Sequence, residues 1–136
     1  MILILCVDDE MGMAFNGRRQ SRDRAVSRDI AVIAAGRPVL MRERSLKLFE
    51  GECVQFRVAE DGLALAGAEE LCFVEFEPVE LLAEHAEKII LYRWNRRYPA
   101  DLYCTIPFEK WVREETTEFP GHSHELITRE VYVHEG

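Results

Sequence analysis

Arginine side chains gather in two short segments of the chain that have the composition of an anion-binding site. The segment 16–23 reads Asn-Gly-Arg-Arg-Gln-Ser-Arg-Asp, and the segment 94–98 reads Trp-Asn-Arg-Arg-Tyr. A guanidinium group donates in a planar fork that suits phosphate and carboxylate, and Trp94 or Tyr98 offers a ring for stacking. Surface ion pairs with Asp and Glu would explain the same segments equally well, so both interpretations stay open.

The first segment belongs to a longer basic stretch, residues 17–47. This stretch contains nine Lys and Arg residues and three acidic residues, in a chain whose formal net charge is −8. Such an asymmetry indicates either an anion-binding face or a solvated helix surface that pairs with the acidic remainder. The negative net charge argues against nucleic acid as the partner. The stretch also contains no aromatic residue of the kind that binds single strands by stacking.

A third polar segment, residues 121–125, contains His122 and His124. Two histidines at i and i+2 can share a metal ion only with further ligands nearby, and Glu125 is the one such neighbour in the segment. We therefore predict a turn between two strands and no metal site. The chain also has no GxSxG, HExxH or GxxxxGK[ST] motif, so the common hydrolase, metalloprotease and nucleotide-loop signatures are absent from the sequence.

The cysteines and the N-terminal run indicate the cellular compartment. No two cysteines form a CxxC or another close pair, so reduced and mostly buried thiols are expected. The apolar run 1–7 is too short to cross a membrane and lacks the basic lead and cleavage site of a signal peptide. We therefore expect a single cytoplasmic domain over 1–136 with no membrane partner. The four cysteines are Cys6, Cys53, Cys72 and Cys104.

Hydrophobic patterns predict the elements that position these segments. Ile2–Val7 is typical of a strand buried on both faces, 8–17 of a loop, and the pattern from Ser21 to Gly36 predicts a helix. Alternating helices and strands followed by a hairpin indicate an α/β fold, with a mainly parallel central sheet flanked by helices and a C-terminal antiparallel hairpin. The other predicted strands are 37–41, 53–58, 71–76, 88–94, 111–116 and 127–133, and the other predicted helices are 45–49, 61–68 and 79–86.

Three stretches of the chain resemble the dihydrofolate reductases. Residues 3–8, with Gly12-Met13 and Asn16-Gly17, are similar to the first strand and mobile loop of that family. Gly-Arg-Pro-Val-Leu-Met at 36–41, with Arg44-Ser45 after it, resembles the family's next strand and helix start. Residues 88–92 and 98–103, followed by Trp111, are similar to its late strand, a turn and a tryptophan. The resemblance spans nearly the whole chain and implies a dihydrofolate reductase-like fold.

The resemblance also implies a ligand-anchoring carboxylate. In this family a carboxylate at the start of the first helix holds the pterin ring by accepting its hydrogen bonds. Asp23 falls at that place when two residues are removed from the loop before it. Tyr92 stands where the family has a threonine that bonds this carboxylate, and Ser27 replaces an aromatic residue one turn further. The other interpretation of Asp23 is an N-cap of the helix.

On the cofactor side, the chain departs from the family. Arg42 and the pair Val74-Glu75 stand where the resemblance implies glycines that let the backbone approach the dinucleotide. A glutamate beside a pyrophosphate is also electrostatically unfavourable. Ser45, at a predicted helix start, and Arg44 remain candidates for binding a phosphate. We therefore expect no NADPH cofactor in the ordinary role.

Three functions stay open, and we rank a binding protein for a nucleotide-like or phosphorylated small molecule first. The second is an active NADPH-dependent reductase of a folate- or pterin-like substrate, and the third is a module that docks an acidic protein or RNA on the 17–47 face. The replaced glycines disfavour the second, and Asp23 disfavours the third. The predicted site has Asp23 and Tyr92 as the anchoring pair, and its ligand-binding residues are Asn16, Arg18, Arg19, Arg22, Arg42, Arg44, Ser45 and Trp94.

Overall fold

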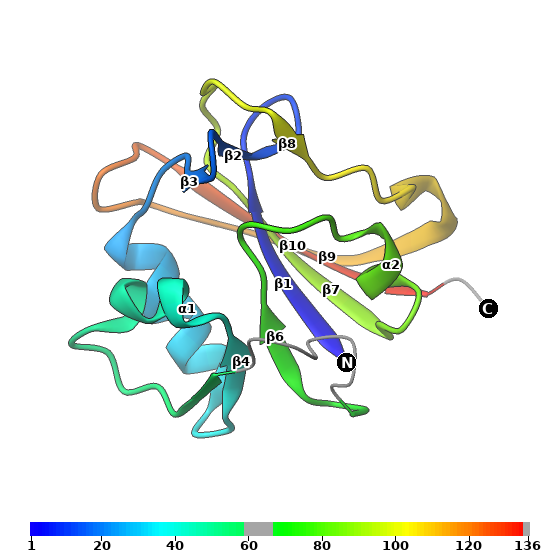
Figure 1. Ribbon diagram of the computed structural model, residues 1–136, viewed down its shortest axis with the longest axis horizontal. Helices are drawn as coiled ribbons and strands as arrows, with labels where there is room; N and C mark the ends of the chain where they lie inside the picture. Colours follow the sequence, from blue (N-terminus) through cyan, green and yellow to red (C-terminus); the bar gives the residue numbers. More distant parts are fainter. Residues whose placement is uncertain (59–66, 135–136) are drawn as a thin grey trace.

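A seven-stranded sheet runs through the centre of the computed structural model, which describes residues 1–58 and 67–134 (Figure 1). Its strand order is β5-β4-β6-β1-β7-β10-β9. All neighbours from β5 to β7 pair in parallel, whereas β10 is antiparallel to both β7 and β9. This is the predicted α/β class, with its antiparallel C-terminal pair. The strands are β1 Ile2–Val7, β4 Val39–Met41, β5 Phe56–Val58, β6 Leu71–Phe73, β7 Lys88–Arg93, β9 Trp111–Phe119 and β10 Ile127–His134.

The central strand β1 is buried on both faces, which explains its uninterrupted apolar run. Because side chains alternate along a strand, Leu3 and Leu5 pack into one hydrophobic cluster, and Ile2 and Ile4 pack into the other. The sheet therefore has a core on each side, and β1 contributes to both.

Helices cover the two faces unequally. The helix α1, Arg24–Ala34, packs Val26, Ile30 and Ala34 against the face of Ile2 and Ile4, and this spacing is the helical one that the sequence predicted. It ends where Ala35 and Gly36 take positive φ angles of 49° and 85°. A 3₁₀ helix, η1 (Glu43–Phe49), lies on the same face, and the short α2 (Glu80–Ala83) packs on the other.

A small second sheet stands at the end of the molecule that is uppermost in Figure 1. Its order is β3-β2-β8, with β2 Gly12–Phe15, β3 Arg18–Arg19 and β8 Leu102–Tyr103, all antiparallel. The expectation of a loop over 8–17 is therefore wrong for β2. Asn16 and Gly17, with φ angles of 54° and 71°, form the two-residue turn between β2 and β3 that such residues favour.

Several predicted elements differ in length from those observed. The strand expected over 71–76 ends at Phe73. The helix expected over 79–86 is also shorter, since α2 spans Glu80–Ala83. The helix expected over 61–68 falls largely outside the described residues. Cys72 and Cys104 are buried as predicted, but Cys53 is exposed. No helix in the described ranges has the length and apolar character needed to cross a bilayer.

Candidate functional site

Asp23 is held by a ring of donors from two segments of the chain. As the N-cap of α1, its carboxylate accepts from the Ala25 amide at 2.8 Å. The amides of His122, Ser123 and His124 donate to the same carboxylate at 2.8, 2.9 and 3.0 Å. The helix-capping interpretation is thus confirmed, and the ligand-anchoring role of Asp23 stays a prediction.

The imidazole of His124 completes this ring. Its Nδ1 lies 2.9 Å from Asp23 Oδ2, and both side chains are buried. Burial alone would raise the pKa of Asp23, but hydrogen bonds from the His122 amide, the His124 ring and the Ala25 and Ser123 amides lower it to about 2. Asp23 is therefore ionised at neutral pH and fixes the 121–125 loop to the start of α1.

The other ring nitrogen of His124 faces two hydroxyl groups. Nε2 lies 2.8 Å from Tyr98 Oη and 3.1 Å from Ser21 Oγ. Trp94 stacks on the imidazole, with ring centroids 4.8 Å apart. The predicted segments 16–23, 94–98 and 121–125 therefore meet at one place, and their meeting point is His124.

Tyr92 contacts a different carboxylate from the one that the resemblance implied. Its hydroxyl donates to Asp29 Oδ2 at 2.6 Å, and Arg129 donates to both oxygens of Asp29 at 2.9 and 2.7 Å. Burial and the neighbouring Asp29 charge raise the pKa of Tyr92, so its hydroxyl stays protonated. Tyr92 and Asp23 therefore do not form a pair in this structure.

Glu75 stands where the resemblance to dihydrofolate reductases implies a glycine. Two of the predicted ligand-binding residues form hydrogen bonds to its carboxylate. Arg19 donates to both of its carboxylate oxygens at 2.8 Å, and Ser45 Oγ donates to it at 2.6 Å. The Glu75 side chain is only 9% exposed. The chain thus places its own carboxylate against donors that would suit a phosphate.

Arg42 and Arg44 lie beside this cluster but contact different partners. Arg42 donates to both oxygens of Glu77, at 2.9 and 3.2 Å. Arg44 donates to the carbonyl oxygen of Gly17, and its guanidinium lies 3.9 Å from the ring centroid of Phe76. This cation–π contact sets Arg44 against an aromatic surface.

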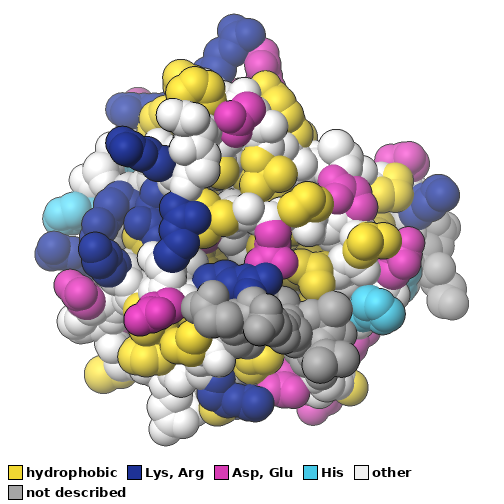
Figure 2. Space-filling view, in the orientation of Figure 1, with side chains coloured by type: hydrophobic (Ala, Val, Ile, Leu, Met, Phe, Trp, Pro, Cys, Tyr) yellow, Lys and Arg dark blue, Asp and Glu magenta, His cyan; other side chains and the backbone are white. Residues whose placement is uncertain are grey.

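A basic pocket of about 620 Å³ opens above Phe76, between β3 and η1. Figure 2 shows Lys and Arg side chains gathered on the side of the molecule where β3 and α1 lie in Figure 1. Four cations and one carboxylate line the pocket with the ring, so the lining carries a net positive charge suited to an anion. The lining residues are Arg18, Arg19, Glu43, Arg44, Lys47 and Phe76.

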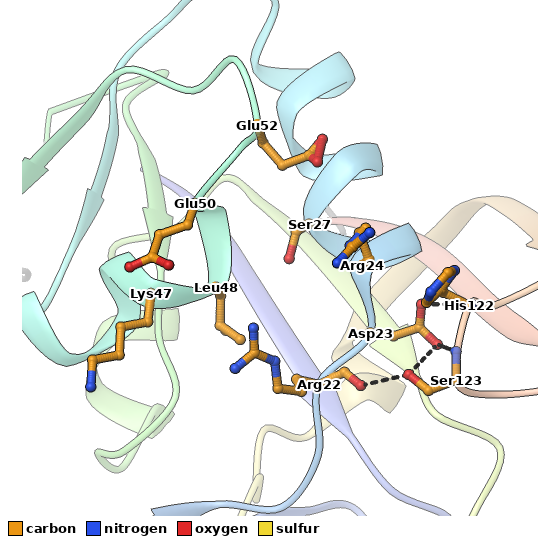
Figure 3. Close-up of a pocket in the computed structure, with 10 residues that line it drawn as sticks. All are labelled: Arg22, Asp23, Arg24, Ser27, Lys47, Leu48, Glu50, Glu52, His122 and Ser123. Carbon is orange, nitrogen blue, oxygen red and sulfur yellow. Dashed lines mark hydrogen bonds between the residues drawn. The ribbon is translucent and has the colours of Figure 1, made fainter.

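A second pocket, of about 260 Å³, lies between α1, η1 and the 121–125 loop. Figure 3 shows Arg22 reaching toward η1, with Glu50 and Glu52 on the chain that follows η1. Lys47 lines both this pocket and the basic pocket. The mixture of charges makes this second pocket less selective for anions than the first.

The remaining predicted residues lie apart from the basic pocket. Asn16 is exposed in the β2–β3 turn, where its backbone N–H donates to the Asp101 carboxylate at 3.0 Å. Trp94 is buried under His124. Within 1–58 and 67–134, no group of three or more His, Cys, Asp or Glu residues is placed to hold a metal ion.

Sequence reasoning missed two residues of the basic pocket and the partner of Tyr92. Lys47 and Phe76 line the basic pocket, and Asp29 is the partner of Tyr92. Lys47 was visible as part of the basic stretch, and Phe76 directly follows the glutamate that replaces a glycine. Neither residue type identified its role, because the pocket forms only where the chain after β6 lies against η1, as the hydrogen bond from Ser45 to Glu75 shows.

The arrangement of the strands matches that of a solved reductase. A dihydrofolate reductase from Enterococcus faecalis, complexed with NADP(H) and RAB-propyl, aligns with a TM-score of 0.66 over 99% of this chain and 96% of that chain. The two sequences are 13% identical. The chain therefore has a dihydrofolate reductase-like fold, as predicted, and the likeness concerns the fold alone. No protein-family model and no curated protein matches this sequence.

Proposed function

We propose that this protein uses a dihydrofolate reductase-like fold to bind a phosphorylated or similarly anionic small molecule, without ordinary NADPH-dependent hydride transfer. The observation that carries the proposal is the basic pocket, which Arg18, Arg44 and Lys47 line together with Phe76. Nucleotide-like ligands are included, because an aromatic ring beside guanidinium groups suits a planar base next to a phosphate.

The position of Glu75 supports the second half of the proposal. The resemblance implies a glycine at this position, beside the dinucleotide. Here the Glu75 carboxylate lies against Arg19 and Ser45, so an incoming pyrophosphate would meet a like charge at hydrogen-bonding distance from the same donors. We infer that an anionic ligand binds further out, at Arg44 and Lys47.

One observation favours a reductase as the second candidate. The similar Enterococcus faecalis structure is of an enzyme that holds NADP(H). A reductase of this chain would need Glu75 and Arg42 to move away from the place where the cofactor's phosphates would lie.

We also propose a cytoplasmic location, since the cytoplasm keeps thiols such as that of the exposed Cys53 reduced.

A thermal-shift titration tests the proposal with NADPH, NADP, dihydrofolate and a panel of nucleotides and sugar phosphates. A ligand that binds the native state raises the unfolding midpoint in a concentration-dependent way. We expect a shift with a phosphorylated compound and none with dihydrofolate. Lys47→Glu should abolish the shift, because it reverses a charge in the pocket lining.

The matched control is Lys110→Glu, which makes the same charge change at an exposed site in η3 (Phe108–Lys110). It should leave the shift intact. A shift with NADPH that both variants retain would favour the reductase. Silence with every compound would contradict the proposal and point to a macromolecular partner on the basic face.

A further inference from the structure

Three side chains form a hydrogen-bonded relay that the proposed ligand site does not use. Ser21 Oγ lies 3.1 Å from His124 Nε2, and His124 Nδ1 lies 2.9 Å from Asp23 Oδ2. Ser21 and Asp23 precede α1, and His124 reaches them because its loop folds onto the N-cap. A nucleophile, a base and an orienting carboxylate at these distances are the parts of a serine hydrolase centre.

The protonation states follow from the partners. Asp23, with a pKa of about 2, is ionised at neutral pH and only accepts hydrogen bonds. In neutral His124 the proton therefore sits on Nδ1, facing the carboxylate. Nε2 then has one lone pair, which accepts from either the Ser21 or the Tyr98 hydroxyl. When it accepts from Ser21 it acts as a general base, and the Tyr98 proton is left to donate elsewhere. The stacked Trp94 holds the imidazole ring in this orientation.

Ser21 borders space that the hydrolytic water can enter. It is partly exposed and lines two cavities of about 10 Å³ each, roughly enough for one water molecule apiece. Apolar side chains, including Val26, Phe49 and Phe73, wall one of them. Cys6 lines both cavities, but burial and the Glu75 charge raise the pKa of its thiol, so it is a poor nucleophile.

The Ser21 cavity adjoins the second pocket, which supplies room for the rest of a substrate. The second pocket and the apolar-walled cavity share Arg22, Asp23, Ser27 and Leu48 in their linings. The cavities beside Ser21 are too small for an acyl group, so an ester would approach Ser21 from its exposed side, with an anionic alcohol portion toward Arg22 and Lys47. Arg22 and Lys47 therefore suit a carboxylic ester whose alcohol portion is anionic.

We propose that Ser21, His124 and Asp23 form a centre that hydrolyses such esters. Ser21 Oγ attacks the carbonyl carbon as its proton passes to His124 Nε2. The bond to the alcohol oxygen then breaks, and the alcohol leaves with that proton. Water attacks the acyl-serine in the same way, giving its proton to His124, and release of the acid returns the proton to Ser21. Asp23 acts as a positioning residue through His124.

Tyr98 supplies a donor for the charge that develops on the carbonyl oxygen. Its hydroxyl lies 3.2 Å from Ser21 Oγ and 2.8 Å from His124 Nε2. A tyrosine hydroxyl beside the reacting oxygen can stabilise a tetrahedral intermediate. This gives the centre a second group whose removal should slow the reaction without removing the nucleophile.

The test combines labelling by a small alkyl fluorophosphonate with hydrolysis of p-nitrophenyl acetate. We expect the native protein to carry the label on Ser21, located by peptide mass spectrometry, and heat-denatured protein to remain unlabelled there. Ser21→Ala should abolish both the label and protein-dependent hydrolysis. Unfolding curves of each variant establish that it is folded.

A pair of tyrosine variants separates chemistry from structure. Tyr98→Phe should slow labelling about tenfold or more, in line with the loss of one transition-state donor. Tyr103→Phe removes a hydroxyl that bonds only to the Ala100 carbonyl in the described structure, and it should label at the wild-type rate. Equal rates for wild type and Ser21→Ala, or a label on another residue, would overturn the proposal. Ligand binding at Lys47 would stand in either case.

Discussion

Two carboxylates lie close to the carboxyl end of the central sheet, and the molecule holds them in opposite ways. Asp23 is gripped mainly by backbone amides, three of which belong to the 121–125 loop. Glu75 is gripped by side chains, those of Arg19 and Ser45. Backbone donors cannot turn toward a ligand without unfolding the loop, whereas an arginine can exchange one anion for another. The first carboxylate therefore belongs to the architecture, and the second is held by donors to which the proposed ligand site extends.

This comparison also explains why the anion-binding proposal rests on the side of Glu75. Arg19 and Arg44 both approach Phe76, with guanidinium carbons 5.5 and 3.9 Å from the ring centroid. The donors around Glu75 thus continue into the basic pocket, which is lined by Lys47 as well. A ligand phosphate and the Glu75 carboxylate would draw on neighbouring members of one cationic group.

Removing the Asp23 carboxylate should produce the largest effect. Asp23→Ala leaves buried amide and imidazole donors without an acceptor, and it removes the cap of α1. We expect the free energy of unfolding to fall by about 3 kcal/mol, measured by urea denaturation. Asp9→Ala, at an exposed aspartate, should change it by less than about 0.5 kcal/mol. Equal effects would show that Asp23 is no architectural group.

The pH dependence should reveal the same carboxylate. The pKa of Asp23 is about 2 in the folded protein and 3.8 as the ordinary value, so the group stabilises the native state fully above pH 3.8. That contribution, about 2 kcal/mol, is lost as the pH falls through the folded pKa. The difference in unfolding free energy between wild type and Asp23→Asn should shrink from pH 5 to pH 2, roughly over this interval. A constant difference would contradict the assignment.

Neutralising Glu75 should lower the free energy of unfolding less than Asp23→Ala does. It should also raise the affinity for an anionic ligand. Glu75→Gln keeps the shape but removes the charge, so we expect a loss of about 1 kcal/mol in unfolding free energy. Arg19 would then be available to a ligand, and the affinity for pyrophosphate should rise about tenfold, measured by calorimetry. An unchanged affinity would separate Glu75 from the basic pocket.

The sheet was predictable because its pattern is local. The apolar run of β1 and the 3.6-residue spacing of α1 each follow from burial alone. The β2 strand was missed because its four residues, Gly-Met-Ala-Phe, carry little strand pattern. Its pairing with β8, far along the chain, supplies the missing stabilisation.

The sequence predicted which residues belong to the candidate site, but it did not predict which of them form hydrogen bonds with one another. The sequence identified Arg19, Ser45 and Glu75, but nothing in it showed that they bond to one another. Likewise, nothing in the sequence indicated that His124 contacts Asp23, which lies 101 residues earlier in the chain. Such contacts depend on how segments far apart in the sequence come together in the fold, which local sequence patterns do not encode. Tyr92 illustrates the same limit, since it bonds to Asp29 rather than to the implied carboxylate.

The most direct test of the central claim is a calorimetric titration of the wild-type protein with pyrophosphate and with NADPH. If the basic pocket binds anions while Glu75 fills the place of the implied glycine, pyrophosphate should bind saturably. NADPH should then bind no more tightly than the same nucleotide without its nicotinamide ring, titrated in parallel. Binding of NADPH at least tenfold tighter than that fragment would contradict the account, because it would mean that the nicotinamide finds a site of its own.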